Sequence, residues 1–207
     1  KGPVAASFAS FKTYHAESAW TWEKLALTRA RVLAGDPSLI ADVTAAIQAS
    51  LAAPRDEATT RKDVVEMRGL MLREHNPKSV WDIKRSRGGL VELEFMAQFL
   101  QLLHAHARPD ILRTNTFAAF EALLGAGVLS ADHASRLLEA ARLYHRLTQV
   151  LRLCLDGTFM PDEALPGLNR AIAQAAQVPD VRIAEDLLRE HESAVSALFD
   201  KIIGKPD

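Results

Sequence analysis

The sequence predicts an all-α fold: a multi-helix bundle of about seven or eight helices with a C-terminal helical layer. Apolar residues recur at intervals of three and four, and the helix formers Ala, Leu, Arg and Glu dominate the composition. Alternating apolar and polar runs rich in β-branched residues, which are typical of strands, are absent. With 207 residues, 48% of them hydrophobic, the chain is long enough to bury a substantial core.

Glycine and proline bound the first two predicted helices. The first helix begins at about residue 6 or 8 and runs to residue 33, where a glycine ends it. The second begins at Asp36-Pro37, which supplies a cap and a proline for the first helical position, and it runs to about residue 53, before Pro54.

The third and fourth predicted helices flank the longest irregular segment, residues 76–89. Thr60-Arg61-Lys62-Asp63 is typical of a capping box, and it opens a helix through residue 74. The fourth, central helix runs from residue 90 to about residue 106. Because its apolar residues occupy nearly every face, we expect this helix to be the buried core of the bundle.

The sequence of the C-terminal half predicts four further helices. One spans residues 115–124 and is closed by glycines, and the next is capped by Ser130 and extends to residue 155. The last two span residues 167–177 and 181–203.

We predict that residues 1–157 form a helical accessory domain and that residues 158–207 are C-terminal helices packing on it. The stretch 159–166, with two prolines, is the expected seam. The C-terminal helices form either a second layer of one domain or a semi-independent subdomain.

Composition excludes several classes of protein. A formal net charge of −1 disfavours nucleic-acid binding, which demands a basic surplus. The longest apolar stretch, residues 90–103, is interrupted by polar residues, and residues 1–20 lack a secretory signal, so we expect no membrane span and a cytoplasmic protein. The single cysteine, Cys154, is expected to be a small buried residue in a reducing compartment. The histidines lack the spacing of a metal site, so no metal ligands are predicted. Ser and Cys have no neighbouring base pattern that would make a nucleophile, so no catalytic residues are predicted.

The segment 81–95 carries the main functional signal. Lys84, Arg85 and Arg87 precede the pair Gly88-Gly89, which stands directly before the central helix. Unpaired N–H groups at a helix N-terminus attract anions, and glycines let a ligand approach the backbone. The pattern therefore indicates a phosphate site. The alternative is an ordinary solvated loop that leads into a helix, since such a loop also contains glycine, lysine and arginine.

Three blocks of the sequence resemble bacterial glutamine synthetase adenylyltransferases, and a related signature occurs in PII uridylyltransferases. Residues 84–95 resemble the signature Lys-x-x-x-Gly-Gly-hydrophobic-x-Asp/Glu-Ile-Glu-Phe of that family. Residues 19–32 resemble its Trp-Thr-Trp-Glu-x-x-Ala-Leu-x-Arg-Ala-Arg segment, and Val65-Glu66-Met67-Arg68 followed by Met71 is a looser match. The resemblance covers roughly residues 2–155.

This resemblance implies transfer of AMP from ATP to a tyrosine of glutamine synthetase, with the opposite reaction in the other half of the enzyme. It also implies ATP and Mg²⁺ as cofactors, and control by glutamine and the PII signalling protein. The family's Asp-x-Asp motif is absent from residues 1–207, and Lys1-Gly2-Pro3-Val4 resembles sequence just after its last catalytic strand. We therefore expect the helical part that follows the second, adenylylating nucleotidyltransferase domain, inactive by itself. That upstream domain, glutamine synthetase and PII are the expected partners.

The resemblance also assigns roles to individual residues. Lys84, with Arg87, Gly88 and Gly89, would contact the nucleotide phosphates; the alternative for Lys84 is a solvated loop lysine. For Glu92 and Glu94, elementary electrostatics predicts interaction with the helix dipole or buried pairing with Arg29 or Arg31. The third alternative is that they position the nucleotide or metal directly.

Arg29 and Arg31 also have two alternative predicted roles, as members of structural ion pairs or as contacts to the phosphate. Trp20 and Trp22 are predicted to pack in the core or against another domain, and stacking on a base is the less favoured alternative. The competing hypothesis for the whole chain is a helical module that binds glutamine synthetase or PII without contacting nucleotide.

Overall fold

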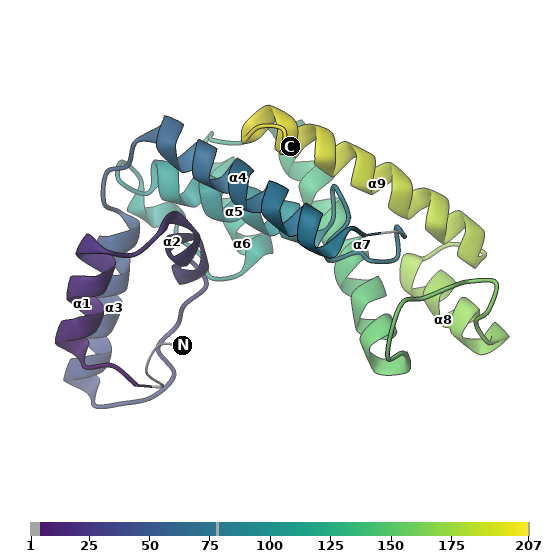
Figure 1. Ribbon diagram of the computed structural model, residues 1–207, viewed down its shortest axis with the longest axis horizontal. Coiled ribbons are helices and arrows are strands. Elements are labelled where there is room, and N and C mark those ends of the chain that lie inside the picture. Colours follow the sequence, from purple (N-terminus) through teal and green to yellow (C-terminus); the bar gives the residue numbers. More distant parts are fainter. Residues whose placement is uncertain (1–4, 78, 207) are drawn as a thin grey trace. The chain divides into compact units, whose positions relative to one another are not determined.

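The computed structural model describes residues 5–77 and 79–206, and within these ranges every regular element is a helix (Figure 1). The all-α prediction is therefore confirmed. The described elements are α1 (Phe8–Glu17), α2 (Thr21–Leu27), α3 (Pro37–Leu51), α4 (Glu57–His75), α5 (Leu90–His104), a 3-10 turn η1 (Pro109–Ile111), α6 (Thr116–Gly125), α7 (Ala131–Cys154), α8 (Pro166–Ala176) and α9 (Val181–Ile202). The chain start expected to follow a catalytic strand, residues 1–4, lies outside the described residues.

Contacts between residues divide the chain into two compact units. The first unit contains residues up to 64 together with 97–128, and the second contains 65–96 together with 129–207. The division falls inside α4 and α5, so each unit contains part of both helices. These units cut across the predicted ranges 1–157 and 158–207, whose folding as separate domains stays a prediction.

In the first unit, α3 packs against α1 and α2 (Figure 1). Buried side chains of this unit come from α2, α3, α5 and α6, and they include Leu25, Leu51, Phe99, Leu102 and Phe120. The contribution of α5 agrees with its predicted place in a core.

The predicted single helix over residues 6–33 is wrong, because the chain breaks between α1 and α2. Trp20 adopts an extended conformation, and its N–H donates a hydrogen bond to Oε2 of Glu23 at 2.9 Å. The other oxygen of Glu23 accepts from the Tyr14 hydroxyl at 2.6 Å. Glu23 thus caps a new helix start, and this local interaction outweighs the continuous helical pattern.

Polar caps determine most of the other helix starts. Asp36 and Ser130 accept backbone N–H groups at the starts of α3 and α7, as predicted, and Asn115 does the same at the start of α6. The predicted capping box at Thr60 is wrong. Asp56 is the cap instead, since its carboxylate accepts the N–H of Thr59 at 2.7 Å and α4 therefore begins at Glu57.

In the second unit, α8 and α9 pack against α7 and against each other (Figure 1). The buried residues at their contacts include Leu137, Tyr144, Leu147, Ile172, Leu188 and Phe199. The C-terminal helices thus do form a layer on the preceding helix, as the sequence predicts.

Two expectations about burial are wrong. Cys154 is exposed because it is the last residue of α7, beside the exposed Leu153. Trp20 and Trp22 are 71% and 54% exposed, since α2 buries Leu25 and Leu27 instead. The core role of the tryptophans is excluded, while their packing against another domain stays a prediction.

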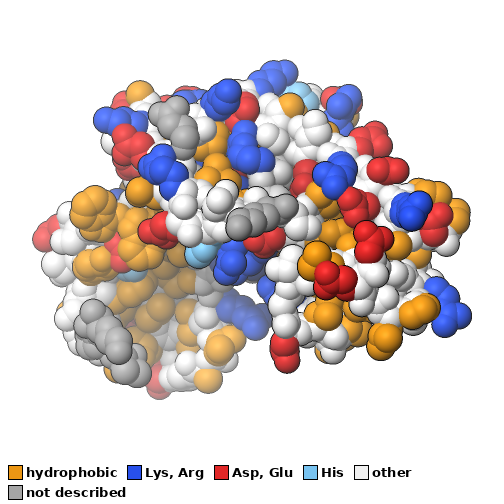
Figure 2. Space-filling model, turned by 45° about the vertical axis from the view of Figure 1, so that its right-hand side comes forward, with side chains coloured by type: hydrophobic (Ala, Val, Ile, Leu, Met, Phe, Trp, Pro, Cys, Tyr) orange, Lys and Arg blue, Asp and Glu red, His pale blue; other side chains and the backbone are white. Residues whose placement is uncertain are grey.

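The surface is mixed in charge. Lys and Arg side chains are interspersed among Asp and Glu side chains on the face shown in Figure 2, in keeping with the net charge of −1. No helix within the described ranges is both long and apolar enough to span a membrane.

Candidate functional site

The signature segment is a series of tight turns in the second unit. The N–H of Asp82 donates to the Ser79 carbonyl at 3.0 Å, the N–H of Ser86 to the Asp82 carbonyl at 3.0 Å, and the N–H of Gly89 to the Ser86 carbonyl at 2.9 Å. Each turn therefore holds the next in place.

These turns also use the N–H groups at the start of α5. The N–H of Leu90 donates to the Ile83 carbonyl at 2.8 Å, and that of Val91 donates to the Lys84 carbonyl at 3.2 Å. Two of the N–H groups expected to attract an anion, those of Leu90 and Val91, are thus satisfied within the chain.

A buried ion cluster centred on Glu92 anchors the segment. Oε1 of Glu92 accepts from Nε of Arg68 at 2.9 Å and from Nη1 of Arg87 at 2.6 Å, while Oε2 accepts from the N–H of Gly88 at 2.8 Å. The side chains of Glu92 and Arg68 are 0% and 1% exposed. A buried charge must be compensated, so this pairing is a requirement of the fold.

Arg68 joins the cluster to the loop. Its Nη2 donates to the carbonyls of Arg85 and Ser86 at 2.8 and 2.9 Å. One side chain of α4 therefore fixes both the carboxylate of α5 and the backbone that displays Lys84 and Arg85.

The buried pairing predicted for Glu92 is thus present, but its partners are Arg68 and Arg87 and not Arg29 or Arg31. Arg29 and Arg31 are exposed residues of the first unit. Arg68 belongs to the third block of the family resemblance, so the sequence did contain a signal for it. The role of the half-buried Glu94 stays a prediction.

Arg87 is held by a second carboxylate. Its Nη2 donates to Asp200 of α9 at 2.5 Å, and its guanidinium lies 5.8 Å from the ring centre of Phe199. With two acidic partners, Arg87 has a structural role in the observed geometry. Its predicted phosphate contact would require these pairs to rearrange.

Gly88 and Gly89 are needed because other chain segments approach them closely. A Cβ on Gly88, which has φ +74°, would lie 1.7 Å from the carbonyl oxygen of Glu192, and a Cβ on Gly89 would lie 2.3 Å from that of Ile83. The carbonyl of Gly88 also accepts the hydroxyl of Tyr144 at 2.9 Å, and burial raises the pKa of this tyrosine. Close packing thus accounts for both glycines, and a phosphate contact by them stays a prediction.

Trp81 fixes the other end of the loop. Its buried ring meets Phe159 edge-on, with centroids 4.8 Å apart, and its Nε1 donates to Glu185 of α9 at 3.0 Å. Trp81 and Arg68 together hold residues 79–89 in one conformation.

A carboxyl group with an unusual environment lies beside the loop. Glu192 of α9 lines a cavity of about 390 Å³ with Arg87 and Arg189, and its Oε1 has no hydrogen-bond partner among the described residues. Burial raises the pKa of Glu192 to about 8, although the Ser86 hydroxyl and the charge of Arg189 oppose this shift.

Two exposed cations of the loop line another cavity. Lys84 and Arg85 are exposed, and they line a cavity of about 250 Å³ with Arg152 of α7. The hydroxyl of Thr148, which lines the same cavity, is buried and lacks a partner within residues 5–77 and 79–206. Three cations and a hydroxyl with only one acid, Asp82, suit an anion. Sequence reasoning missed Arg152 and Thr148 because they lie more than sixty positions away from Lys84.

A metal centre is not built from the part of the chain that the structure describes. No three His, Cys, Asp or Glu side chains there are close enough together to hold an ion. These residues therefore do not fit the Mg²⁺ that the family resemblance implies.

Comparison with known sequences yields two family matches. Residues 1–46 match the family described as glutamate-ammonia ligase adenylyltransferase, and residues 59–203 match the family described as GlnD PII-uridylyltransferase. The second match contains the whole signature segment.

Individual relatives share substantial identity with the chain. The bifunctional glutamine synthetase adenylyltransferase/adenylyl-removing enzyme of Rhodopseudomonas palustris (strain TIE-1) is 43% identical over 206 residues, covering 100% of this chain and 21% of the relative. The proteins of the same name from Bradyrhizobium diazoefficiens and Xanthobacter autotrophicus are 42% and 40% identical, covering 96% and 98% of this chain and 20% of each relative. The chain thus spans about a fifth of the length of these curated relatives.

Proposed function

The chain belongs to the glutamine synthetase adenylyltransferase family, and from this premise we propose that it is the helical part of an enzyme that transfers AMP from ATP to a tyrosine of glutamine synthetase. It would follow the second, adenylylating nucleotidyltransferase domain, while the other half of the enzyme removes AMP.

The observation that carries the proposal is the display of Lys84. The buried pair Arg68–Glu92 and the ring of Trp81 hold the loop rigidly, while Lys84, Arg85 and Arg152 face one small cavity. A rigid support is what a phosphate-binding group needs, because its charge must be in place before the transition state forms.

The residues present indicate which catalytic groups this chain would supply and which would come from the upstream domain. Carboxylates that hold Mg²⁺ on ATP would come from the upstream nucleotidyltransferase domain, since the described residues group no suitable acids. This chain would supply cations that neutralise phosphate charge, so by itself it would not transfer AMP.

Partners follow from the same assignment. Glutamine synthetase would be the protein substrate, and the PII protein and glutamine would control the reaction in the cytoplasm.

The test uses the enzyme that carries this sequence and measures incorporation of labelled AMP into glutamine synthetase. Lys84→Ala should lower turnover roughly 10- to 150-fold, the effect of losing one charge-assisted hydrogen bond in the transition state. The thermal stability of the enzyme should not change, because Lys84 is exposed. Lys205→Ala, at another exposed lysine of the second unit, is the matched control. Turnover of the Lys84 variant within twofold of the control would remove Lys84 from the mechanism.

A second candidate function is a helical module that binds glutamine synthetase or PII without contacting nucleotide. The exposure of Trp22 on α2 and of Trp20 directly before it favours this function, because tryptophan is enriched where proteins meet. Calorimetric titration of the chain with each protein tests this module. Binding that is abolished by Trp22→Ala and is insensitive to Lys84→Ala would support it, and absence of binding to both proteins would reject it.

A further inference from the structure

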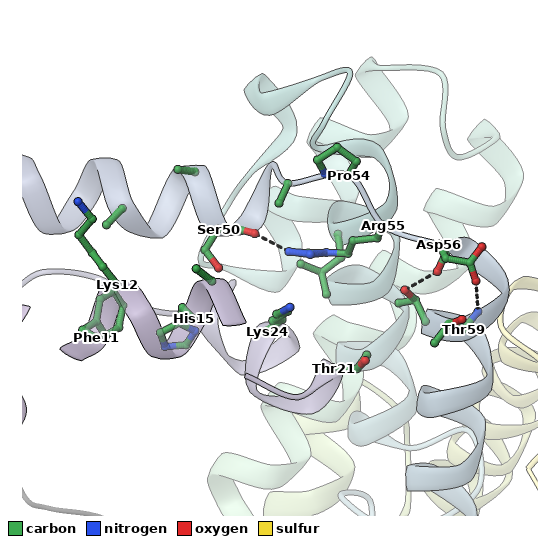
Figure 3. Close-up of a pocket in the computed structure, with 16 residues that line it drawn as sticks. Phe11, Lys12, His15, Thr21, Lys24, Ser50, Pro54, Arg55, Asp56 and Thr59 are labelled. Atoms are coloured by element: carbon green, nitrogen blue, oxygen red, sulfur yellow. Dashed lines mark hydrogen bonds between the residues drawn. The ribbon is translucent and has the colours of Figure 1, made fainter. Parts of the chain in front are cut away.

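A further cavity of interest lies in the first unit and contains none of the signature residues. It has a volume of about 620 Å³, within the range of small-molecule sites. Its walls come from α1, α2, α3, the loop between α3 and α4, the start of α4 and one residue of α5 (Figure 3).

Buried polar atoms without partners concentrate here. Of the six buried side-chain N or O atoms that lack a hydrogen-bond partner in the described residues, three line this cavity: Nδ1 of His15, Oγ of Ser50 and Nε of Arg55. Figure 3 shows these residues arranged around one space, with Lys24 of α2 between them. Buried polar groups are normally hydrogen-bonded, so such a concentration indicates a missing partner.

Cations also outnumber acids among the residues that line the cavity. Lys12, Lys24 and Arg55 line it, whereas Asp56 is the one acid, and its carboxylate is engaged with the N–H of Thr59 at the start of α4.

Arg55 is the most constrained of these cations. Its Nη2 donates to the carbonyl of Ser50 at 2.5 Å, which leaves Nε for another acceptor (Figure 3). Burial lowers the pKa of Arg55, and burial followed by the charge of Arg55 lowers the pKa of Lys24. Two neighbouring cations that lose solvation and repel each other are stabilised by a shared anion.

The remaining wall is apolar. Ala46 and Ala49 of α3 and Leu102 of α5 contribute to it, together with the ring of Phe11, which lies 4.4 Å from that of His15 between centroids. A ligand of this cavity therefore needs an anionic end and an apolar body.

We propose that this cavity binds a small organic anion, with a carboxylate or phosphate head between Arg55 and Lys24 and an apolar body along the alanines of α3. Nε of Arg55, Oγ of Ser50 and Nδ1 of His15 are the hydrogen-bonding groups for the ligand. The site is a second binding function of the chain, independent of the loop at Lys84.

The experiment titrates the isotope-labelled 207-residue chain with hexanoate and, separately, with hexyl phosphate, and follows the NMR signals of the Arg55 Nε–H group and the His15 ring. Both signals should shift saturably with at least one anion. Hexanol and hexylamine, which have the same apolar body without the negative charge, should produce no saturable shift. The tighter of the two anions identifies the head group as carboxylate or phosphate.

Substitutions locate the site. Lys24→Gln should weaken binding about tenfold, the effect of one charge-assisted contact, and Ala49→Leu should weaken it by filling the apolar wall. Lys205→Gln, in the second unit, should bind as the unchanged chain does. Circular dichroism establishes that each variant is folded. No saturable shift with either anion, equal shifts with hexanol, or unchanged binding by both folded Lys24→Gln and Ala49→Leu would overturn the inference.

Discussion

Replacing Glu92 by glutamine tests whether the buried ion cluster holds the second unit together. The substitution keeps the size of the side chain and removes its charge. Glu92 accepts three hydrogen bonds, from Arg68 at 2.9 Å, Arg87 at 2.6 Å and the Gly88 N–H at 2.8 Å. Arg68, whose side chain is 1% exposed, loses its counter-charge with no access to water.

The magnitude follows from burial. Removing one partner of a buried pair costs about 3–5 kcal/mol, because the other charge stays desolvated. For a chain of this length that corresponds to a fall of roughly 6–20 °C in melting temperature. Asp200→Asn is the control within the same network. Its pair with Arg87 has side chains 33% and 31% exposed, so its loss should cost under about 1 kcal/mol.

The assay is urea unfolding of the 207-residue chain, followed by circular dichroism at 222 nm. A double variant, Arg68→Met with Glu92→Leu, should be more stable than Glu92→Gln alone, since it removes both buried charges. A free energy of unfolding for Glu92→Gln within 1 kcal/mol of that for Asp200→Asn would refute the reasoning.

Three further predictions use other features of the structure. Gly88→Ala should destabilise the chain by at least about 2 kcal/mol more than Gly127→Ala in urea unfolding. Both glycines have φ near +74°, but only at Gly88 would the added Cβ lie 1.7 Å from a backbone oxygen. Equal losses of stability would contradict the packing argument. Burial raises the pKa of Glu192 from 4.5 to about 8, so between these pH values the folded chain keeps a proton that the unfolded chain has released. The free energy of unfolding should therefore fall as the pH rises from 4.5 to 8. Glu192→Gln should flatten that part of the profile, measured as the free energy of unfolding at pH 5, 7 and 9, and an unchanged slope would exclude this carboxyl as its cause. Cys154 should react with Ellman's reagent in the folded chain as fast as in the urea-unfolded chain, since it is exposed. Slow reaction in the absence of urea would instead support the sequence-based prediction that this thiol is buried.

Local signals in the sequence predicted most of the helices. Asp36 before Pro37, Asn115 and Ser130 supply side-chain acceptors for the first free N–H groups of their helices, and this chemistry acts within three residues. The break at Trp20 was missed because Glu23 is also a good helix former, and its second partner, Tyr14, lies nine positions away.

The candidate site was predicted in part. The signature segment drew attention to Lys84 and Glu92, and a buried partner for Glu92 follows from its place on an apolar helix. Which arginine provides the pair depends on tertiary packing, since Arg68 lies 24 positions from Glu92 along the chain. The cavity around Arg55 carries no sequence motif, because its lining residues come from several helices.

The link between Arg87 and Asp200 has a consequence for synthesis of the protein. The two residues are 113 positions apart, and the oxygen that crowds Gly88 belongs to Glu192. At translation rates of roughly 5–20 residues per second, α9 leaves the ribosome about 5–20 s after the signature segment. During that interval the turns at residues 79–89 lack the helix that closes over them. The nascent chain therefore exposes Arg87 until α9 has been synthesised, and the apolar face of α7 is exposed from its own synthesis until α8 and α9 pack on it.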